Sequence, residues 1–341
     1  MKKTTARIFA LLLVALMACT MLPTFAMAAE GNENLKIAEP NMIKSADKTS
    51  AKPGEIVNFT LTSRVPGYLG DYLQPADPKD PIIVTNGLEG RGSYDIVFHD
   101  NMVDAFEFNN DIVVTVNGKT LAADLYTVTT ETGDGCTFHV TMDLVKIYLA
   151  GGYFTFEEIA NAPAIVITYS AKLKEGTTAG TYTNQAWGAF EGTKETAKPI
   201  VEVNVYAIKV YKYDQANENK ETGVHAPLAG ATFILKDAEG NTVDTLVSDE
   251  KGFVTFNGLK AGKYTLTEDK APEGYIKSDK ALEITLPNDK MTENVVTAEF
   301  ANAKIPHTGG EGTAMFVTMG IVLMGAAAAL YLASQKKRFV F

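Results

Sequence analysis

Cysteine is scarce in this chain of 341 residues, which contains only Cys19 and Cys136. We expect Cys19 to be removed with an N-terminal segment, so that Cys136 stands alone in the mature protein. An internal disulfide is therefore excluded. Because small extracellular domains often use disulfides as covalent staples, an exported chain of this kind needs another means of stabilising its fold.

Positive charge is also in short supply. The chain has 31 Lys and Arg residues against 41 Asp and Glu residues, which gives a formal net charge of −10. A nucleic-acid groove requires clustered Lys and Arg to bind phosphates, so the composition argues against nucleic acid as a partner. We interpret the acidity as that of an ordinary soluble surface.

Motifs for catalysis and for metal or cofactor binding are missing as well. There is no Cys-His or Ser-His-Asp arrangement and no glycine-rich phosphate loop. The four histidines lie far apart in the sequence, and Cys136 is typical of a small packed residue in a strand. The sequence therefore predicts no enzyme, no metal centre and no cofactor. The four histidines are His99, His139, His225 and His307.

The N-terminus has the features of a secretory signal peptide over residues 1–28. Three basic residues precede an apolar stretch over residues 8–22, and Ala26 and Ala28 form a small-residue cleavage site. This apolar stretch is short for a membrane anchor, and it continues past a weak lipoprotein-like site at Cys19. We expect cleavage after Ala28 and export of the mature chain.

The C-terminus combines an apolar segment with a basic tail. Residues 313–333 carry no charge and are long enough to span a bilayer as a helix. The tail over residues 334–341 contains Lys336, Lys337 and Arg338, and positive residues of this kind stay on the cytoplasmic side. The body of the protein is therefore expected outside the membrane.

The body between residues 29 and 304 shows alternation of period two rather than helical periodicity. Its short segments are rich in β-branched and aromatic residues and are bounded by Gly, Asn, Asp or Pro. Asn117-Gly118 is a hairpin turn signal. The pattern predicts an all-β fold with two tandem Ig-like or prealbumin-like β-sandwich domains. The clearest predicted strands are 56–62, 112–116, 138–142 and 164–169, and two brief helices are predicted at 144–150 and 156–160.

A domain boundary is predicted near Tyr206. A strand over residues 201–205 closes a first unit, which spans residues 40–206. "AIKVYKYD" then opens a second unit, which spans residues 207–304 and ends where the C-terminal segments begin.

The second unit carries a resemblance that covers nearly its whole length. The segments "IKVYKYD", "PLAGATFILKD", "DEKGFVTFNGLKAGKYTLTEDKAPEGY" and "VTAEFANAK" resemble the B-type repeat domain of collagen adhesins and pilins, a prealbumin-like sandwich. "YTLTEDKAPEGY" is similar to the E-box of that family. The resemblance implies a spontaneous amide crosslink between Lys212 and Asn302, promoted by the carboxyl group of Glu268.

The implied chemistry needs these residue types. An ammonium group is not a nucleophile, so burial must lower the pKa of the lysine. A neutral carboxyl group can hydrogen-bond to the amide and shuttle protons. Lys209 competes with Lys212, but alternation places the two side chains on opposite faces of the strand. The family's spacing, with Lys two residues before Asp214, selects Lys212.

The first unit resembles the isopeptide-forming domain of Gram-positive backbone pilins. The resemblance rests on "KSADKTSAKPGEIVNFTLTSRVP", "YDIVFHDNM" followed by "VVTVNG", "IVITYSAKL" and "TYTNQAWGAF". It implies a bond to Asn184 with Asp100 as the promoting acid. Lys44 is the expected amine and Lys48 is the alternative, because no spacing rule decides between them.

The pentapeptide before the apolar segment is similar to the cell-wall sorting signal of Gram-positive surface proteins. It reads Ile305-Pro306-His307-Thr308-Gly309, with Ile in the place of the usual Leu. The resemblance implies that a sortase cleaves after Thr308 and passes its carbonyl to a peptidoglycan precursor or to a lysine of another pilin subunit. Membrane attachment would then last only until cleavage, and the product would reside in the cell wall or in a pilus.

Together these resemblances predict a wall-anchored fimbrial subunit. The alternative is a non-polymerising adhesin that binds a host or matrix ligand through residues 67–92, which form a predicted Gly- and Pro-rich loop. No lysine can be assigned as the acceptor of the next subunit, because the pilin motif that carries it has no counterpart here; Lys198 before Pro199 is a guess.

Overall fold

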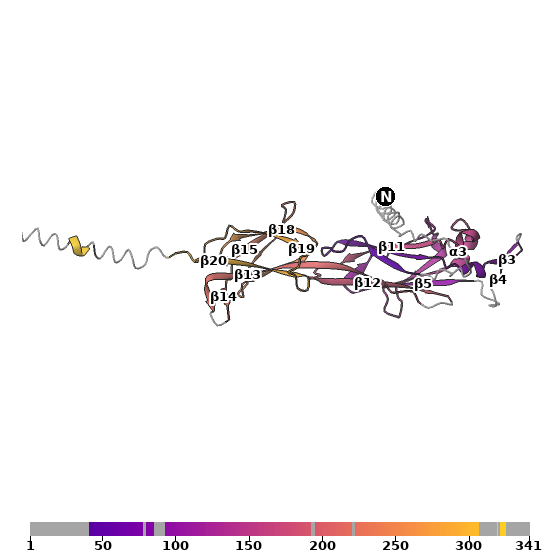
Figure 1. Ribbon diagram of the computed structural model, residues 1–341, viewed down its shortest axis with the longest axis horizontal. Coiled ribbons are helices and arrows are strands. Elements are labelled where there is room, and N and C mark those ends of the chain that lie inside the picture. The colour runs from indigo at the N-terminus through magenta and orange to yellow at the C-terminus, as the bar shows by residue number, and fades with distance from the viewer. Residues whose placement is uncertain are drawn as a thin grey trace, which may run out of the picture.

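The computed structural model describes residues 41–77, 80–84, 93–191, 195–219, 222–306, 319 and 321–324. Over these residues the chain forms β-sandwiches arranged end to end along one long axis (Figure 1). Strands dominate, and the predicted all-β sandwich class is confirmed. The predicted signal peptide lies outside the described residues. In the part of the chain that the structure describes, no helix has the length and apolarity needed to cross a membrane, and almost all of the predicted span 313–333 lies outside that part.

The first sandwich packs a six-stranded sheet against one end of an eight-stranded sheet. The six-stranded sheet has the order β1-β2-β11-β7-β8, with β6 also pairing with β11. The relevant part of the eight-stranded sheet has the order β12-β5-β10-β9. The strands are β1 (Ile43–Ala46), β2 (Ile56–Arg64), β5 (Asp95–Met102), β6 (Phe106–Phe108), β7 (Val113–Val116), β8 (Lys119–Thr120), β9 (Tyr126–Thr129), β10 (Phe138–Asp143), β11 (Ala164–Leu173) and β12 (Gly180–Phe190).

Short elements connect these strands or extend from them. The two predicted helices are confirmed as α3 (Leu144–Ala150) and α4 (Phe156–Ile159). The segment 67–92, which the sequence presents as one long loop, instead contains a helical turn and a two-stranded sheet within its described residues. These elements are α2 (Leu69–Tyr72), β3 (Gln74–Asp77) and β4 (Asp80–Val84), and a 3-10 turn, η1 (Ala123–Leu125), precedes β9.

The second sandwich continues the eight-stranded sheet and faces it with a four-stranded one. Strand β13 (Ile200–Asn219) pairs with β12 in the first sandwich and with β14, β17 and β20 in the second. The facing sheet has the order β16-β15-β18-β19. The strands are β14 (Val224–Pro227), β15 (Thr232–Asp237), β16 (Thr242–Val247), β17 (Phe253–Leu259), β18 (Gly262–Lys270), β19 (Ala281–Leu286) and β20 (Val295–Asn302).

Strand β13 runs without a break between the two sandwiches, where the sequence predicts the end of one strand and the start of another. Residues 200–219 contain no Gly or Pro that would interrupt the pairing. Two hydrophobic cores nevertheless meet on this strand: Val205 belongs to the first and Tyr206 to the second. Before this point the side chains that face the core have odd numbers, as in Val203 and Val205, and after it they have even numbers, as in Ile208. The register with β17 shifts at the same place.

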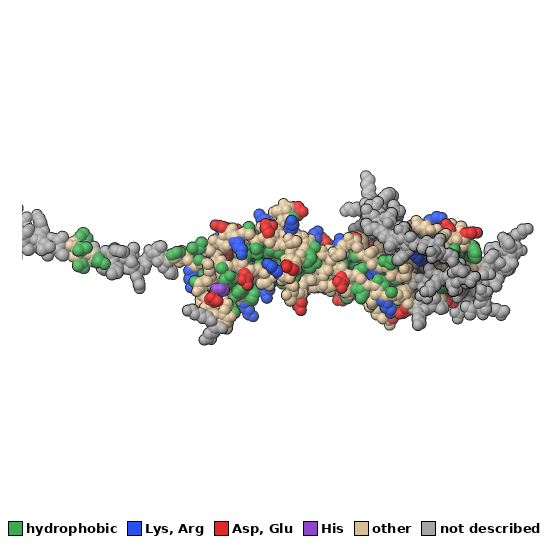
Figure 2. All heavy atoms as spheres, viewed as in Figure 1, with side chains coloured by type: hydrophobic (Ala, Val, Ile, Leu, Met, Phe, Trp, Pro, Cys, Tyr) green, Lys and Arg blue, Asp and Glu red, His purple; other side chains and the backbone are tan. Residues whose placement is uncertain are grey.

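Polar contacts beside β13 also join the two sandwiches. The side chain of Asn294 donates to Oδ1 of Asn204 at 3.0 Å, and the backbone N–H of Ala261 donates to Oγ of Ser50 at 3.0 Å. On the exterior, acidic and basic side chains are interspersed over the face shown in Figure 2. This distribution agrees with an ordinary soluble surface.

The hairpin at Asn117-Gly118 provides a test of the turn assignment. Both residues have positive φ angles, 51° and 75°, and they join β7 to β8 through the pair Val116 and Lys119. A Cβ atom at position 118 would meet nothing within 4 Å, so Gly118→Ala imposes backbone strain without a clash. We expect the free energy of unfolding to fall by about 1 kcal/mol.

Chemical denaturation measures this effect, and Gly70→Ala is the matched control. Gly70 lies in α2 without a positive φ, and its added Cβ would make ordinary contact with the ring of Phe156 at 3.8 Å. The control should leave stability unchanged or slightly raised. Equal effects of the two substitutions would contradict the turn assignment.

Candidate functional site

Six polar residues singled out from the sequence are withdrawn from solvent. Such residues are rarely buried unless they are paired, so their location in the core requires an explanation. They form two groups, one in each sandwich. The relative exposures are 7% for Lys44, 0% for Asp100 and Asn184, 0% for Lys212, and 2% for Glu268 and Asn302.

The first group lies between the two sheets of the first sandwich. Lys44 is the inward-facing residue of β1 in the six-stranded sheet, whereas Asp100 on β5 and Asn184 on β12 belong to the eight-stranded sheet. The Nζ atom of Lys44 lies 2.7 Å from Oδ1 of Asn184 and also contacts Oδ2 of Asp100. The amine and the amide that the sequence predicts to react are therefore in direct contact.

Tyr169 on β11 completes this group, although sequence reasoning missed it. Its hydroxyl donates to Oδ2 of Asp100, accepts from Nδ2 of Asn184 at 3.1 Å and lies 2.8 Å from Nζ of Lys44. The only signal in the sequence is that Tyr169 is the single aromatic residue of this strand. Its hydroxyl links the acid to both reacting groups, while its ring stacks on Phe59 at 5.4 Å.

Burial dominates the electrostatics of the first group. Desolvation lowers the pKa of Lys44 to about 8, although the nearby Asp100 carboxylate opposes the shift. Desolvation also raises the pKa of Asp100, against the opposing effects of Lys44, Tyr169 and Asn184. Both changes favour a neutral amine beside a protonated carboxyl group.

The alternative amine, Lys48, lies elsewhere. Its Nζ atom donates to the backbone carbonyl of Ile56 at 2.7 Å in a solvent-exposed position. It also lies 4.0 Å from the carboxylate of Asp47. Between the two lysines that the sequence leaves open, the structure brings Lys44 to Asn184.

The second group is built from neighbouring strands and the facing sheet. Lys212 on β13 and Asn302 on β20 lie on adjacent parallel strands, where Asp214 is the register partner of Asn302. Glu268 reaches them from β18 in the opposite sheet. Its Oε1 atom lies 3.4 Å from Nζ of Lys212, and its Oε2 atom accepts from Nδ2 of Asn302 at 2.9 Å. The carboxyl group therefore bridges the amine and the amide.

Further contacts fix the members of the second group. Oε2 of Glu268 also accepts from the backbone N–H of Ser278 at 2.7 Å, and Nδ2 of Asn302 donates to the carbonyl of Ile276 at 2.5 Å. Nζ of Lys212 donates to the carbonyl of Phe300 at 3.1 Å. Burial lowers the pKa of Lys212, while Glu268 opposes that shift.

The backbone around Lys212 is equally constrained. Its N–H donates to the carbonyl of Gly252 at 2.7 Å. Gly252 has a φ of 76°, and a Cβ there would lie 2.4 Å from the carbonyl oxygen of Lys212. The competing Lys209 faces the other side of β13, where its amine lies 4.1 Å from the centre of the Phe253 ring.

Two of the histidines, which lie far apart in the sequence, are neighbours in the fold. His99 and His139 are distant in the sequence, but they are register partners on β5 and β10, and their ring nitrogens Nδ1 and Nε2 lie 2.9 Å apart. Asp134 and Cys136 join them. Antiparallel pairing created this proximity, which linear spacing does not reveal. Cys136 itself is buried, as the sequence predicted.

The sorting pentapeptide is only partly described. Ile305 is exposed, and its N–H donates to the carbonyl of Gly274 at 2.9 Å. Residues 307–309, which include the predicted scissile position, lie outside the described residues, as does the basic tail.

The fold and the buried groups define a two-sandwich protein with a prealbumin-like second domain. The prealbumin-like fold domain model of the SpaA family matches residues 206–299. The resemblance predicted for the second unit is confirmed.

Relatives among known proteins extend the similarity over most of the chain. The trypsin-resistant surface T6 protein of Streptococcus pyogenes serotype M6 is 23% identical over 281 residues, which cover 77% of this chain and 46% of that protein. This chain thus spans less than half the length of that relative. The serine-aspartate repeat-containing protein F of Staphylococcus epidermidis is 31% identical over 97 residues, covering 28% of this chain and 6% of that protein.

Solved structures share the fold at low sequence identity. The group B streptococcus pilus 2b backbone protein gives a TM-score of 0.53 at 21% identity, covering 76% of this chain and 97% of the other. The RrgB pilus backbone of Streptococcus pneumoniae gives 0.51 at 13% identity, covering 78% and 100%. Both of these solved structures are of pilus backbone proteins, and the T6 protein is a surface protein.

The lowered pKa of Lys44 predicts a pH dependence in a variant that cannot form the bond. Asn184→Ala removes the amide but leaves burial and Asp100, which set the pKa of Lys44. The folded state loses the lysine proton near pH 8, whereas the unfolded chain keeps it until about 10.5. The unfolded state then binds more protons, so stability should rise with pH across this window, by up to about 3 kcal/mol.

The measurement is chemical denaturation of Asn184→Ala at a series of pH values, compared with Lys44→Met/Asn184→Ala. The double variant lacks the titrating amine but keeps every other group, so subtracting its profile removes their contributions. A difference that stays flat between pH 8 and 10.5 would contradict the buried, neutral amine.

Proposed function

We propose that this chain is a sortase-processed fimbrial subunit of a Gram-positive cell surface, stabilised by one Lys–Asn isopeptide bond in each sandwich. The single observation that carries the proposal is the contact of Lys44 with both Asn184 and Asp100 inside an apolar core. An amine, a carboxamide and an acid buried together are the components of amide exchange, and they need no cofactor.

The reaction in the first sandwich follows from the contacts. The neutral amine of Lys44 attacks the carboxamide carbon of Asn184, and protonated Asp100 hydrogen-bonds to the reacting groups and relays the proton. The bond between that carbon and Nδ2 breaks, and ammonia leaves with the transferred proton. One amide nitrogen replaces another, so no oxidant or external acid is consumed.

The second sandwich uses the same chemistry with Glu268 as the acid. The carboxyl group contacts Nζ of Lys212 through one oxygen and Nδ2 of Asn302 through the other. It is therefore suited to relay a proton from the attacking amine to the departing ammonia. The Oδ1 atom of Asn302 is buried and accepts no hydrogen bond from the described residues, so it can accept one as negative charge develops on it.

The two bonds would carry tension along a short covalent route. A pull applied upstream of Lys44 passes to Asn184, follows the chain into β13, and crosses from Lys212 to Asn302 before reaching the sorting signal. The segments 45–183 and 213–301 are then shielded from load. Loops of this length also stabilise the folded state, by about 5 kcal/mol each in the chain-entropy model. These bonds would provide the covalent stabilisation that a disulfide cannot provide in a chain with a single cysteine.

The sorting signal supplies the attachment. We propose that a sortase cleaves after Thr308 and transfers it to a peptidoglycan precursor or to a lysine of another subunit. We place the two domains at residues 40–206 and 207–304. Ile305 and Pro306, which begin the sorting signal, follow the second domain and are exposed. The similarity to the T6 protein and to pilus backbone folds supports assembly into a pilus over a solitary adhesin.

Intact mass spectrometry tests both bonds. Residues 29–304 should weigh less than the sequence formula by two ammonia molecules. Glu268→Ala should restore one ammonia and Asp100→Ala the other, because each acid serves only its own sandwich. The conservative change Lys48→Arg is the control and should leave both losses in place. A mass equal to the formula would reject the bonds.

Wall extracts test the polymer. A ladder of high-molecular-weight bands that contain this chain should form in the native host and should collapse when Thr308→Ala blocks transfer. A single wall-linked band in the native host would instead favour the non-polymerising adhesin. Because the isopeptide bonds form without sortase, the loss of ammonia should be unaffected in the Thr308→Ala variant.

A further inference from the structure

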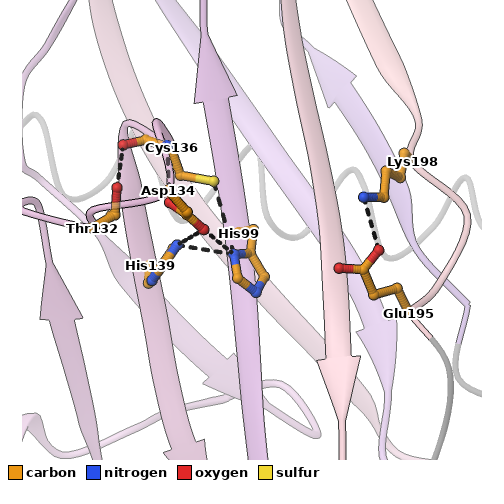
Figure 3. Close-up of polar contacts among 7 residues, drawn as sticks. All are labelled: His99, Thr132, Asp134, Cys136, His139, Glu195 and Lys198. Carbon is orange, nitrogen blue, oxygen red and sulfur yellow. Dashed lines mark hydrogen bonds and ion pairs between the residues drawn. The ribbon is translucent and has the colours of Figure 1, made fainter.

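A second polar cluster lies on the outer face of the first sandwich, where the proposed crosslinks have no role. His99 and His139 project from the same face of β5 and β10, and Asp134 and Cys136 reach them from the loop that leads into β10. Figure 3 shows the four side chains pointing toward one another. One ligand atom from each lies within 4.8 Å of all the others.

The spacing of these atoms fits a tetrahedral metal ion. With zinc about 2.0–2.1 Å from nitrogen or oxygen and about 2.3 Å from sulfur, neighbouring ligand atoms lie about 3.3–3.6 Å apart. The pair Nε2 of His139 and Oδ2 of Asp134 is separated by 3.0 Å, and Nδ1 of His99 lies 3.4 Å from the same oxygen. Sγ of Cys136 lies 3.8 Å from Nδ1 of His99. These three separations lie within about 0.4 Å of the tetrahedral values, and the widest separation in the cluster is at most 4.8 Å.

The loop that carries two of the ligands is already ordered. Oδ1 of Asp134 accepts from the N–H of Cys136 at 3.1 Å, which leaves Oδ2 facing the histidines. Thr132 donates from its hydroxyl to the carbonyl of Cys136 at 2.8 Å. Gly133 and Gly135 flank Asp134 with φ angles of 72° and 84°, a conformation that favours glycine.

Neighbouring side chains cover one side of the cluster. The ring of Trp187 stacks on His99 with a centroid distance of 4.9 Å and an interplanar angle of 4°. The amine of Lys198 lies 4.2 Å from the centre of the Trp187 ring and pairs with Glu195 at 2.8 Å. His99 and His139 are mostly buried, whereas the side chain of Asp134 is 42% exposed and leaves an entry path.

We propose that His99, Asp134, Cys136 and His139 form a structural Zn²⁺ site. Imidazole, thiolate and carboxylate together suit zinc better than calcium or magnesium, which prefer oxygen ligands alone. Binding releases the thiol proton of Cys136 to solvent. The two charges of the ion are then balanced by the thiolate and by the carboxylate of Asp134, and the complex is neutral.

The ion would fasten three segments together. It joins β5, β10 and the loop over residues 130–137, and β5 carries Asp100 on its inward face next to His99. Because all four ligands come from the protein, the site is closed and structural rather than catalytic. It would also hold the one thiol of the mature chain in a metal complex.

Zinc titration of the purified full chain, kept reduced with a thiol-free reductant, tests the site. We expect one bound zinc per chain and an affinity at least about tenfold lower in Asp134→Asn, Cys136→Ala and His139→Gln. His225→Gln is the matched control, because this histidine lies in the second sandwich and stacks on Tyr213. It should bind zinc as the unmodified chain does.

Cobalt provides an independent readout. Bound Co²⁺ should give a thiolate charge-transfer band that Cys136→Ala lacks, and it should quench Trp187, the single tryptophan of the chain. Asp134→Asn changes an exposed loop residue, so it keeps the test valid if a histidine variant fails to fold. The absence of stoichiometric zinc in the unmodified chain would overturn the proposal, as would equal weakening in His225→Gln.

Discussion

The structure depends on the burial of a lysine amine against a carboxyl group and a carboxamide. Removing a charged amine from water is costly, so the core favours its neutral form, and the lowered pKa of both Lys44 and Lys212 expresses that cost. The same burial that penalises the charge prepares the amine as a nucleophile. An arrangement that would only destabilise an ordinary sandwich becomes useful once the amine can be consumed in a covalent bond.

The two sandwiches solve this problem with different geometry. In the first, the amine and the amide come from opposite sheets, and Tyr169 links them to the acid through its hydroxyl. In the second, Lys212 and Asn302 lie on adjacent parallel strands, and Glu268 approaches from the facing sheet. Strand β13 runs without interruption from the first sandwich to Lys212. Over this stretch the proposed load path therefore follows a single paired strand.

Much of this architecture could be predicted from local patterns. Period-two alternation gave β2, β7, β10 and β11, and Asn117-Gly118 marked a two-residue hairpin, because both signals are properties of neighbouring residues. The contacts of Tyr169 and the meeting of His99 with His139 could not be predicted. Each depends on which strands pair and in what register, and no short segment contains that information. The continuity of β13 could not be predicted either, because the pairing of the backbone continues where the side chains pass from one core to the other.

Peptide mapping by tandem mass spectrometry tests the central claim most directly. After proteolysis of the mature protein, a branched peptide should contain Lys44 joined through its Nζ to the side chain of Asn184. A second should join Lys212 to Asn302 in the same way. Recovery of all four residues in separate linear peptides, with both lysine amines free and both carboxamides intact, would contradict the account.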